Sequence, residues 1–229
     1  MCGRFTRMYT WRELVALYRL TDSSPPSNLQ PRYNICPTTT IDAVIERDSK
    51  RVLEQMRWGL VPSWWNKALK ELRLATFNAR AETVAEKPFY RSAFKRTRCL
   101  IPVSGYYEWQ TVGKEKQPYY FTRRDGQIIT IAGLWSEWTN PETSKPQSTC
   151  TMIITEPNKF VAGVHDRMPV ILEEKQFEPW LDDSAVPTSL VTMLKPAGER
   201  TLVCHPVSTR VNSSRADETD AALIKDIAP

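Results

Sequence analysis

CLIPVSGYYEW, residues 99–109, is the stretch of sequence that decides the fold. It begins with an uninterrupted apolar run and ends with aromatic side chains on both sides of a single carboxylate, that of Glu108. The two halves are separated by Ser104-Gly105. Short apolar and aromatic runs divided by small residues are typical of consecutive β-strands. The stretch therefore predicts two strands at the centre of a sheet.

The segments that follow extend this sheet. Residues 99–135 are expected to form its core, with further strands over 118–123 and 127–135. These two strands flank Asp125-Gly126, a dipeptide that favours tight turns between paired strands. The sequence therefore predicts a β-hairpin around this dipeptide.

Glu108 has two interpretations at this stage. In a strand with one face in water, alternation would point Glu108 to solvent beside inward-facing Tyr107 and Trp109. Alternatively, the surrounding aromatic side chains desolvate the carboxylate, which would raise its pKa and suit it to acid–base chemistry. The pattern alone leaves both open.

The other expected elements lie around this core. Thr10 and Glu13 form the pattern of a capping box at the start of a helix. The expected helices cover residues 11–20, 66–73, 88–96, 174–182 and 187–194, and a short helical turn is expected over 158–163. The expected strands cover residues 41–46, 51–58 and 149–155, with a turn at Asp48-Ser49 and a final strand near Val211.

The composition indicates a single, loop-rich domain. The chain has 229 residues, 41% of them hydrophobic, and 17 prolines. It shows no internal repeat and no linker long enough to divide it. We therefore expect one domain over residues 2–212, followed by a polar C-terminal tail over 213–229 that is a short helix or partly free.

Charge and cysteine usage exclude several classes of protein. A net charge of +5 permits an anionic partner such as nucleic acid without requiring one. The 5 cysteines show no metal-binding spacing, so no metal site is expected. The sequence has neither a signal peptide nor an apolar run that spans a membrane, so we expect a cytosolic or nuclear protein with reduced thiols.

The N-terminal sequence Met1-Cys2-Gly3-Arg4 would provide two neighbouring reactive groups if Met1 were removed. Removal of Met1, by an aminopeptidase or by the protein itself, would place an α-amine and a thiol on adjacent carbons of Cys2. The reference pKa values are about 7.7–8.0 for the amine and about 8.5 for the thiol, so both have a reactive fraction at neutral pH. The amine forms an imine with an aldehyde, and the thiol closes that imine to a thiazolidine. The alternative is that a cysteine at this position is incidental.

Three other segments combine polar or aromatic side chains. Trp64 and Trp65 end a loop that is either a corner of the core or a wall for stacking bases. Asn78, Arg80 and Glu82 would share one face of an extended segment. His165-Asp166-Arg167 holds one of the chain's two histidines, the residue type that titrates near neutral pH.

In order along the chain, these segments resemble the SRAP family, the SOS response-associated peptidases. The resemblance extends from residue 2 to about residue 212. The matching motifs are Met1-Cys2-Gly3-Arg4, Arg32-Tyr33-Asn34 with Pro37, Trp58-Gly59 with Pro62-Ser63-Trp64-Trp65, Asn78-Ala79-Arg80 with Glu82, Gly105-Tyr106-Tyr107-Glu108-Trp109, Ala132-Gly133-Leu134-Trp135, His165-Asp166-Arg167-Met168-Pro169 and His205-Pro206-Val207-Ser208. Each is weak alone, and together they are specific.

The resemblance implies an α+β fold, a single domain with a distorted β-barrel-like core and peripheral helices. It also implies a monomeric DNA-repair protein that needs no cofactor. Through Cys2 it would form a covalent crosslink with abasic sites in single-stranded DNA and shield them from strand cleavage. Its location would be cytoplasmic, with the nucleoid in a bacterium, or nuclear in a eukaryote.

The same resemblance implies roles for individual residues. Asn78 would bond the reacting sugar, Glu108 would transfer protons during ring closure and reopening, and His165 would help to open the deoxyribose ring. The expected DNA-binding residues are Arg4, Trp64, Trp65, Arg80, Lys87 and Arg167.

Two alternatives remain. One is a thiol peptidase with Cys2 as nucleophile and His165 as base, for which self-removal of Met1 would be the minimal activity. The other is a non-covalent reader of modified DNA bases, which would not need Cys2.

Overall fold

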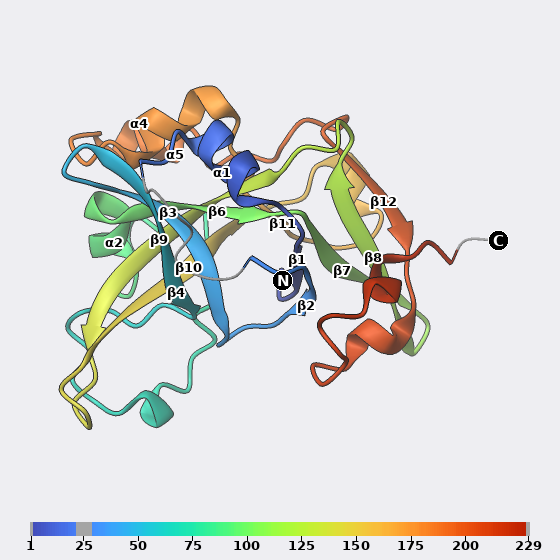
Figure 1. The fold of residues 1–229 in the computed structure, drawn as a ribbon, viewed down its shortest axis with the longest axis horizontal. Coiled ribbons are helices and arrows are strands. Elements are labelled where there is room, and N and C mark those ends of the chain that lie inside the picture. Colours follow the sequence, from blue (N-terminus) through green and yellow to red (C-terminus); the bar gives the residue numbers. More distant parts are fainter. Residues whose placement is uncertain (1, 22–28, 228–229) are drawn as a thin grey trace.

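The computed structural model describes residues 2–21 and 29–227, and a closed β-barrel forms its centre (Figure 1). Each barrel strand pairs with the next around the ring, and β9 closes it by pairing antiparallel with β10. In ring order the strands are β10 (Pro146–Thr155), β4 (Lys50–Trp58), β3 (Thr40–Arg47), β6 (Arg98–Val103) and β9 (Ile129–Thr139). The expected α+β class with a barrel-like core is confirmed.

The hairpin of β3 and β4 follows from its turn residues. Asp48 and Ser49 both have positive φ values, 49° and 59°. Two consecutive left-handed residues make the turn whose twist matches that of the strands on either side. The predicted strands and the turn between them are confirmed, and pairing continues from Arg47↔Lys50 to Thr40↔Arg57.

A second sheet lies beside the barrel and includes the N-terminal strand (Figure 1). Its strands, in spatial order, are β12 (Leu202–Pro206), β8 (Glu115–Arg123), β7 (Gly105–Val112), β1 (Phe5–Arg7) and β2 (Arg32–Ile35). Phe5 of β1 is opposite both Tyr106 and Ile35, so the chain's first residues lie between long strands. Figure 1 shows β1 near the centre of the molecule.

The predicted hairpin at Asp125-Gly126 is wrong. A turn does occur there, with Gly126 at a φ of 73°, but β8 pairs with β7 and β12 while β9 pairs with β6 and β10. The turn therefore passes the chain from the second sheet to the barrel. Turn chemistry specifies a local reversal of the chain, whereas the partner of a strand is chosen by distant segments.

Two short strands extend the barrel at β10. β5 (Asn78–Arg80) pairs parallel with it, and β11 (Met168–Pro169) pairs antiparallel. This arrangement brings the Asn78 segment and the segment after His165 to the same strand. Residues far apart in sequence are thereby placed near one another.

The helices are short and peripheral. Figure 1 shows α1, α4 and α5 together on one side of the barrel. The α-helices are α1 (Trp11–Tyr18), α2 (Arg91–Arg96), α3 (Lys159–Ala162), α4 (Phe177–Leu181) and α5 (Pro187–Val191). The remaining helical turns are 3₁₀ turns at Leu69–Glu71, Glu174–Gln176, Thr209–Asn212 and Ala221–Ile224.

The capping box of α1 is confirmed, because Glu13 N–H donates to the Thr10 hydroxyl and Thr10 N–H donates to the Glu13 carboxylate. Two other predictions are wrong. Residues 66–73 form only a 3₁₀ turn, and Val211 lies in another 3₁₀ turn rather than in a strand. Val211 is fully buried, so the apolar signal there reflects packing and not strand pairing.

The C-terminal segment packs against the second sheet. Leu223 is fully buried in a cluster with Tyr107 and Val207, and Tyr33 N–H donates to the Glu218 carbonyl at 2.6 Å. The described residues of the expected tail therefore contact the domain, while the division at residue 212 stays a prediction. Residues 228–229 lie outside the described part. Within the described ranges, no helix has the length and apolar character needed to cross a bilayer.

Candidate active site around Cys2

Cys2 lies in the hydrophobic cluster between the barrel and the second sheet. It is 2% exposed and packs in the same cluster as Phe5 and Tyr106. The Arg4 carbonyl accepts a hydrogen bond from Tyr107 N–H at 3.0 Å, which continues the pairing of β1 toward the N-terminus. Burial of a residue so near a chain end is unusual, because termini are ordinarily exposed unless they are held in place.

Asn78 fixes the backbone at Cys2. Its Nδ2 donates to the Cys2 carbonyl at 3.0 Å across 76 positions of sequence. Asn78 stands opposite Met152 in the β5–β10 pair, and it is 9% exposed. Its Oδ1 is shielded from solvent and accepts no hydrogen bond from any residue that the structure describes. That oxygen is available to a donor that enters the site.

Glu108 is buried, so the water-facing interpretation is wrong. Its exposed fraction is 1%, and Tyr106 and Tyr107 are equally shielded. Alternation does not bring Glu108 to water because both faces of β7 are covered at this point. Burial raises the pKa of the Glu108 carboxyl to about 7. The group is therefore divided between its acid and base forms near neutral pH, as proton transfer requires.

His165 contacts this carboxylate from a loop after α3. Its Nε2 lies 3.5 Å from Glu108 Oε2. Arg167 N–H donates to His165 Nδ1 at 3.0 Å. The Arg167 carbonyl (3.3 Å) and Asp166 Oδ1 (3.2 Å) lie near the same nitrogen, so the loop holds the ring with Nε2 towards Glu108. Burial lowers the pKa of His165, so the neutral ring predominates near pH 7. The pair can pass a proton between an imidazole and a carboxyl.

The Cys2 thiol is held in its protonated form. Burial raises its pKa well above the usual value, and the neighbouring Glu108 carboxylate raises it further. A thiol next to a carboxylate requires a base to become nucleophilic, and Glu108 is the adjacent base. The same neighbour that opposes ionisation of the thiol can therefore remove its proton.

The burial of Glu108 predicts a pH dependence of stability. Because its pKa in the folded state lies above the unfolded value, the protonated form is favoured by folding. The stabilisation that comes from burying the protonated Glu108 is fully present below about pH 4.5 and is lost as pH rises through about 7. Glu108→Gln, which cannot ionise, should therefore gain stability relative to wild type by up to about 3 kcal/mol over that range.

Urea unfolding at several pH values measures this difference. His165 lies 3.5 Å from Glu108, and its lowered pKa acts in the opposite direction. The same comparison made in a His165→Ala background therefore isolates Glu108. A constant difference between the two proteins across this range would contradict a raised Glu108 pKa.

The expected DNA-binding arginines have different surroundings. Arg80 is exposed on β5, two residues after Asn78. Arg167 forms an ion pair with Glu82, which joins the Asn78 segment to the His165 loop. Arg4 instead donates from Nη1 to Asn34 Oδ1 at 2.7 Å and to the Val211 carbonyl at 2.5 Å. Arg4 thus holds the C-terminal segment against the N-terminal one.

The loop that runs from Trp58 to Trp65 includes both core and surface residues. Trp58 is fully buried, Trp65 is half-buried, and Trp64 is 54% exposed. The Trp64 ring packs edge-on against Phe89 with their centroids 5.9 Å apart. Lys87 is exposed in the turn just before Phe89. The loop is therefore a corner of the core that also presents one tryptophan to solvent.

Comparisons with known proteins identify the family. The family model described as SOS response associated peptidase (SRAP) matches residues 1–214. The chain belongs to the SRAP family. The abasic site processing protein YoqW of Bacillus subtilis is 34% identical over 217 residues, covering 94% of this chain and 96% of that protein. The abasic site processing protein HMCES of Xenopus tropicalis is 36% identical over 226 residues, covering 85% and 67%.

Solved structures have the same fold. A crystal structure of a protein from Bacteroides thetaiotaomicron has a TM-score of 0.85 at 22% identity, covering 98% of this chain and 100% of that one. A protein from Bordetella bronchiseptica has a TM-score of 0.78 at 24% identity, covering 90% and 100%. These likenesses show that the fold described above also occurs in solved structures.

Two residues that join distant segments near Cys2 and His165 were not predicted to do so from the sequence. Glu82 was grouped with Asn78 and Arg80, but its ion pair with Arg167 joins two loops. Asn34 was quoted only within a motif, yet it accepts from Arg4 and donates to the Ser213 and Ala216 carbonyls, both at 3.2 Å. Neither partner could be found from local spacing.

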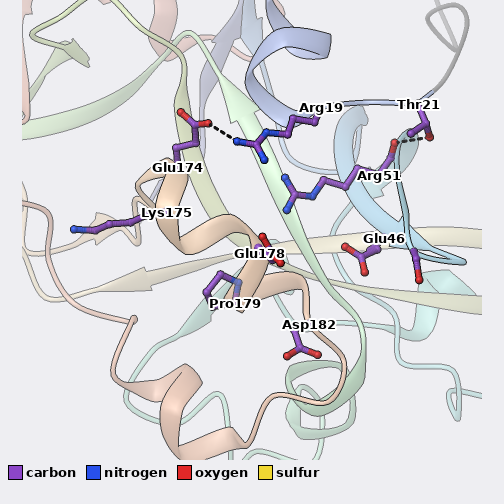
Figure 2. Close-up of a pocket in the computed structure, with 10 residues that line it drawn as sticks. Arg19, Thr21, Glu46, Arg51, Glu174, Lys175, Glu178, Pro179 and Asp182 are labelled. Carbon is purple, nitrogen blue, oxygen red and sulfur yellow. Dashed lines mark hydrogen bonds and ion pairs between the residues drawn. The ribbon is translucent and has the colours of Figure 1, made fainter.

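A large pocket lies away from this site, where α1 ends near the β3–β4 turn and the start of α4. Its volume is about 1200 Å³. In Figure 2, Arg19 points to Glu174, 3.7 Å away, and the Thr21 side chain bonds the Arg51 carbonyl. The charged residues of its lining are Arg19, Arg51, Lys175, Glu46, Glu174, Glu178 and Asp182. Carboxylates outnumber cations, so the pocket is ill suited to a DNA strand.

Proposed function

We propose that the chain processes abasic sites in single-stranded DNA by forming a covalent thiazolidine crosslink through Cys2 after Met1 has been removed. The observation that carries this proposal is the convergence of Cys2, Asn78, Glu108 and His165 from separate segments. Relatives that cover nearly all of the chain are named abasic site processing proteins, which supports the same substrate. Met1 itself lies outside the described residues.

The proposed reaction balances without a cofactor. The Cys2 amine adds to the aldehyde of the ring-opened sugar, and loss of one water leaves an imine. The sulfur then attacks the imine carbon, a C–S bond forms, and the C=N π electrons move to nitrogen, which takes up a proton. The proton released by the thiol supplies it. An N-terminal cysteine is the only residue of the chain that offers both groups on adjacent carbons.

Each neighbour of Cys2 has a role in this scheme. Asn78 holds the Cys2 backbone and presents its free Oδ1 to a hydroxyl of the sugar or the intermediate. Glu108 takes the thiol proton on ring closure and returns it on reopening, because its pKa lies near neutral pH. His165 promotes opening of the sugar hemiacetal, the step that exposes the aldehyde.

Cations near this site would bind the strand. Arg80 and Lys87 are exposed on and after the Asn78 segment, and guanidinium groups suit phosphates. Arg167 is half-buried and paired with Glu82, so it would have to exchange this partner for a phosphate. Trp64 and Trp65 would stack against bases of an unpaired strand. Residues 2–212 would act as one monomeric domain at the genome, in the nucleoid of a bacterium or the nucleus of a eukaryote.

Arg80 and Arg4 should respond differently to alanine substitution. Arg80→Ala should leave unfolding stability within about 0.5 kcal/mol of wild type, because the side chain is exposed. It should weaken binding to undamaged single strands. The slope of log binding constant against log salt concentration should become less negative by about 0.7, the value for one lost phosphate contact. Arg4→Ala should instead lose about 1–3 kcal/mol of stability, because Asn34 and the Val211 carbonyl lose their donor.

Fluorescence anisotropy over a salt series, with urea unfolding of the same proteins, measures both effects. An unchanged salt slope in Arg80→Ala would remove Arg80 from the proposed interface. A fully stable Arg4→Ala would show that its bonds to the C-terminal segment do not contribute to folding.

The thiol peptidase is the less favoured function. A cysteine nucleophile paired with a histidine base usually has a depressed pKa. Here the Cys2 pKa is raised, first by burial and then by the Glu108 carboxylate. The imidazole Nε2 is directed at Glu108. Removal of Met1 by the chain itself or by an aminopeptidase is compatible with the proposed crosslinking.

Intact mass spectrometry tests the proposed function. The purified protein should lack Met1, and incubation with an abasic single strand should give one new species. Its mass should equal protein plus strand minus one water, and peptide mapping should locate the bond at Cys2. A bond mapped to a lysine, or no covalent species, would refute the proposal. Reversible binding that prefers a strand with a modified base to the undamaged strand, with no covalent species, would instead support a non-covalent reader.

A further inference from the structure

The hydroxyl of Tyr106 has no hydrogen-bond partner among the residues that the structure describes. Tyr106 lies on β7, is 1% exposed, and its ring stacks on Phe121 with centroids 5.0 Å apart. Buried hydroxyls are almost always bonded, because an unsatisfied polar group loses its water without compensation. Phenylalanine would fill the same space without this cost. The hydroxyl therefore needs an explanation other than packing.

The other buried tyrosines of the described chain are all bonded. Tyr120 OH lies 2.7 Å from Thr6 Oγ1 and Tyr18 OH lies 2.8 Å from Thr130 Oγ1. The remaining donors are Tyr9 to Asp42, Tyr90 to the Asn78 carbonyl, and Tyr107 to the Tyr33 carbonyl. Among the buried tyrosines that the structure describes, Tyr106 alone has an unbonded hydroxyl, and it lies two positions before Glu108.

The placement of Tyr106 relates it to Cys2. Residues two apart on a strand share a face, so Tyr106 and Glu108 lie on the same side of β7. Tyr106 stands opposite Phe5 and shares a buried cluster with Cys2. Burial raises the pKa of the Tyr106 hydroxyl, and the neighbouring Cys2 and Glu108 raise it further, so the phenol keeps its proton.

We propose that Tyr106 is a positioning residue for the Cys2 thiol: its hydroxyl donates to the sulfur when the thiol loses its proton. This inference rests on the proposed function, because it concerns the thiol in the ring-closing step. The thiol proton passes to Glu108 and then to the imine nitrogen, while Tyr106 keeps its own. The hydroxyl stabilises the negative sulfur and directs it at the imine carbon.

Tyr106→Phe should therefore separate function from stability. Loss of a hydrogen bond to a charged group should slow alkylation of Cys2 by iodoacetamide at neutral pH about tenfold, and should shift its pH profile upward. With an abasic strand, slower ring closure leaves more adduct as the imine. Borohydride reduces the imine but not the thiazolidine, so the fraction fixed by borohydride should rise. Unfolding stability should be unchanged or higher.

Tyr120→Phe is the matched control, because it removes a buried hydroxyl that has a partner in Thr6. It should lose stability and leave both the Cys2 pH profile and the borohydride-fixed fraction unchanged. If Tyr106→Phe loses as much stability as Tyr120→Phe, or keeps the wild-type alkylation profile, the inference is wrong. If wild type forms no adduct, the proposed function fails, yet the alkylation profile still decides the role of Tyr106.

Discussion

Cys2→Ala should abolish the stable crosslink to abasic single-stranded DNA. Once Met1 is removed, this variant would still offer an α-amine, which can form an imine with the sugar aldehyde. Without sulfur that imine cannot close to a thiazolidine and hydrolyses back. We expect no adduct that survives denaturing electrophoresis, but a residual one when borohydride is present. The experiment thus separates the amine's contribution from the thiol's.

Cys2→Ser refines this test, because the hydroxyl keeps the size of the side chain while being a much weaker nucleophile than sulfur. It should behave like Cys2→Ala. Cys36 and Cys204 are half-buried free cysteines, and their alanine variants should crosslink as wild type does. An equal adduct yield from Cys2→Ala and wild type would exclude the thiazolidine.

Glu108→Ala should still crosslink but release DNA far more slowly. Ring opening requires a proton on the leaving group, and general acids typically contribute about 10²–10⁴-fold to such steps. Because burial raises the Glu108 pKa to about 7, release from wild type should slow as pH rises above that value. Glu108→Gln should show slow release at every pH, since an amide cannot supply the proton.

His165→Ala should impair the other end of the reaction. Crosslinking to the closed abasic sugar should slow, whereas crosslinking to a simple open aldehyde should be much less affected. His205 is the matched control, because its Nε2 lies 2.8 Å from the Ile224 carbonyl in the C-terminal segment. His205→Ala should crosslink and release at wild-type rates.

Single-turnover crosslinking followed by a chase with excess competitor DNA measures both steps. Rapid reversal by Glu108→Ala would contradict its assigned role. Equal impairment of His165→Ala on both aldehydes would show that ring opening is not its task. Because His165 and Glu108 are 3.5 Å apart, the double variant should be less impaired than the product of the single effects.

The strands and the motifs of this chain were largely predictable, but their pairing was not. The runs that became β3, β4, β6 and β7 were identified from apolar patterning. Asp125-Gly126 correctly indicated a turn, yet the strands on either side entered different sheets. Val211 was assigned to a strand because burial and strand formation leave the same apolar signal in a short segment.

For the candidate site too, the sequence identified the residues but not their contacts. Asn78, Glu108 and His165 were selected from motifs, and the structure places Asn78 on the Cys2 carbonyl and His165 on Glu108. Whether Glu108 faced water could not be decided from alternation, because that pattern assumes one solvated face. The unbonded hydroxyl of Tyr106 gave no sequence signal, since tyrosine is ordinary in a buried strand.

By itself, the sequence determined the features that depend on residues close together along the chain. These are the capping box at Thr10 and Glu13, the Asp48-Ser49 turn, and the aminothiol that Cys2 offers once Met1 is removed. Only the tertiary structure decided what depends on distant contacts, such as the raised Glu108 pKa and the bond from Arg4 to Val211, 207 positions away. Burial and long-range bonds are properties of how the two sheets close around the N-terminus, which no local pattern encodes.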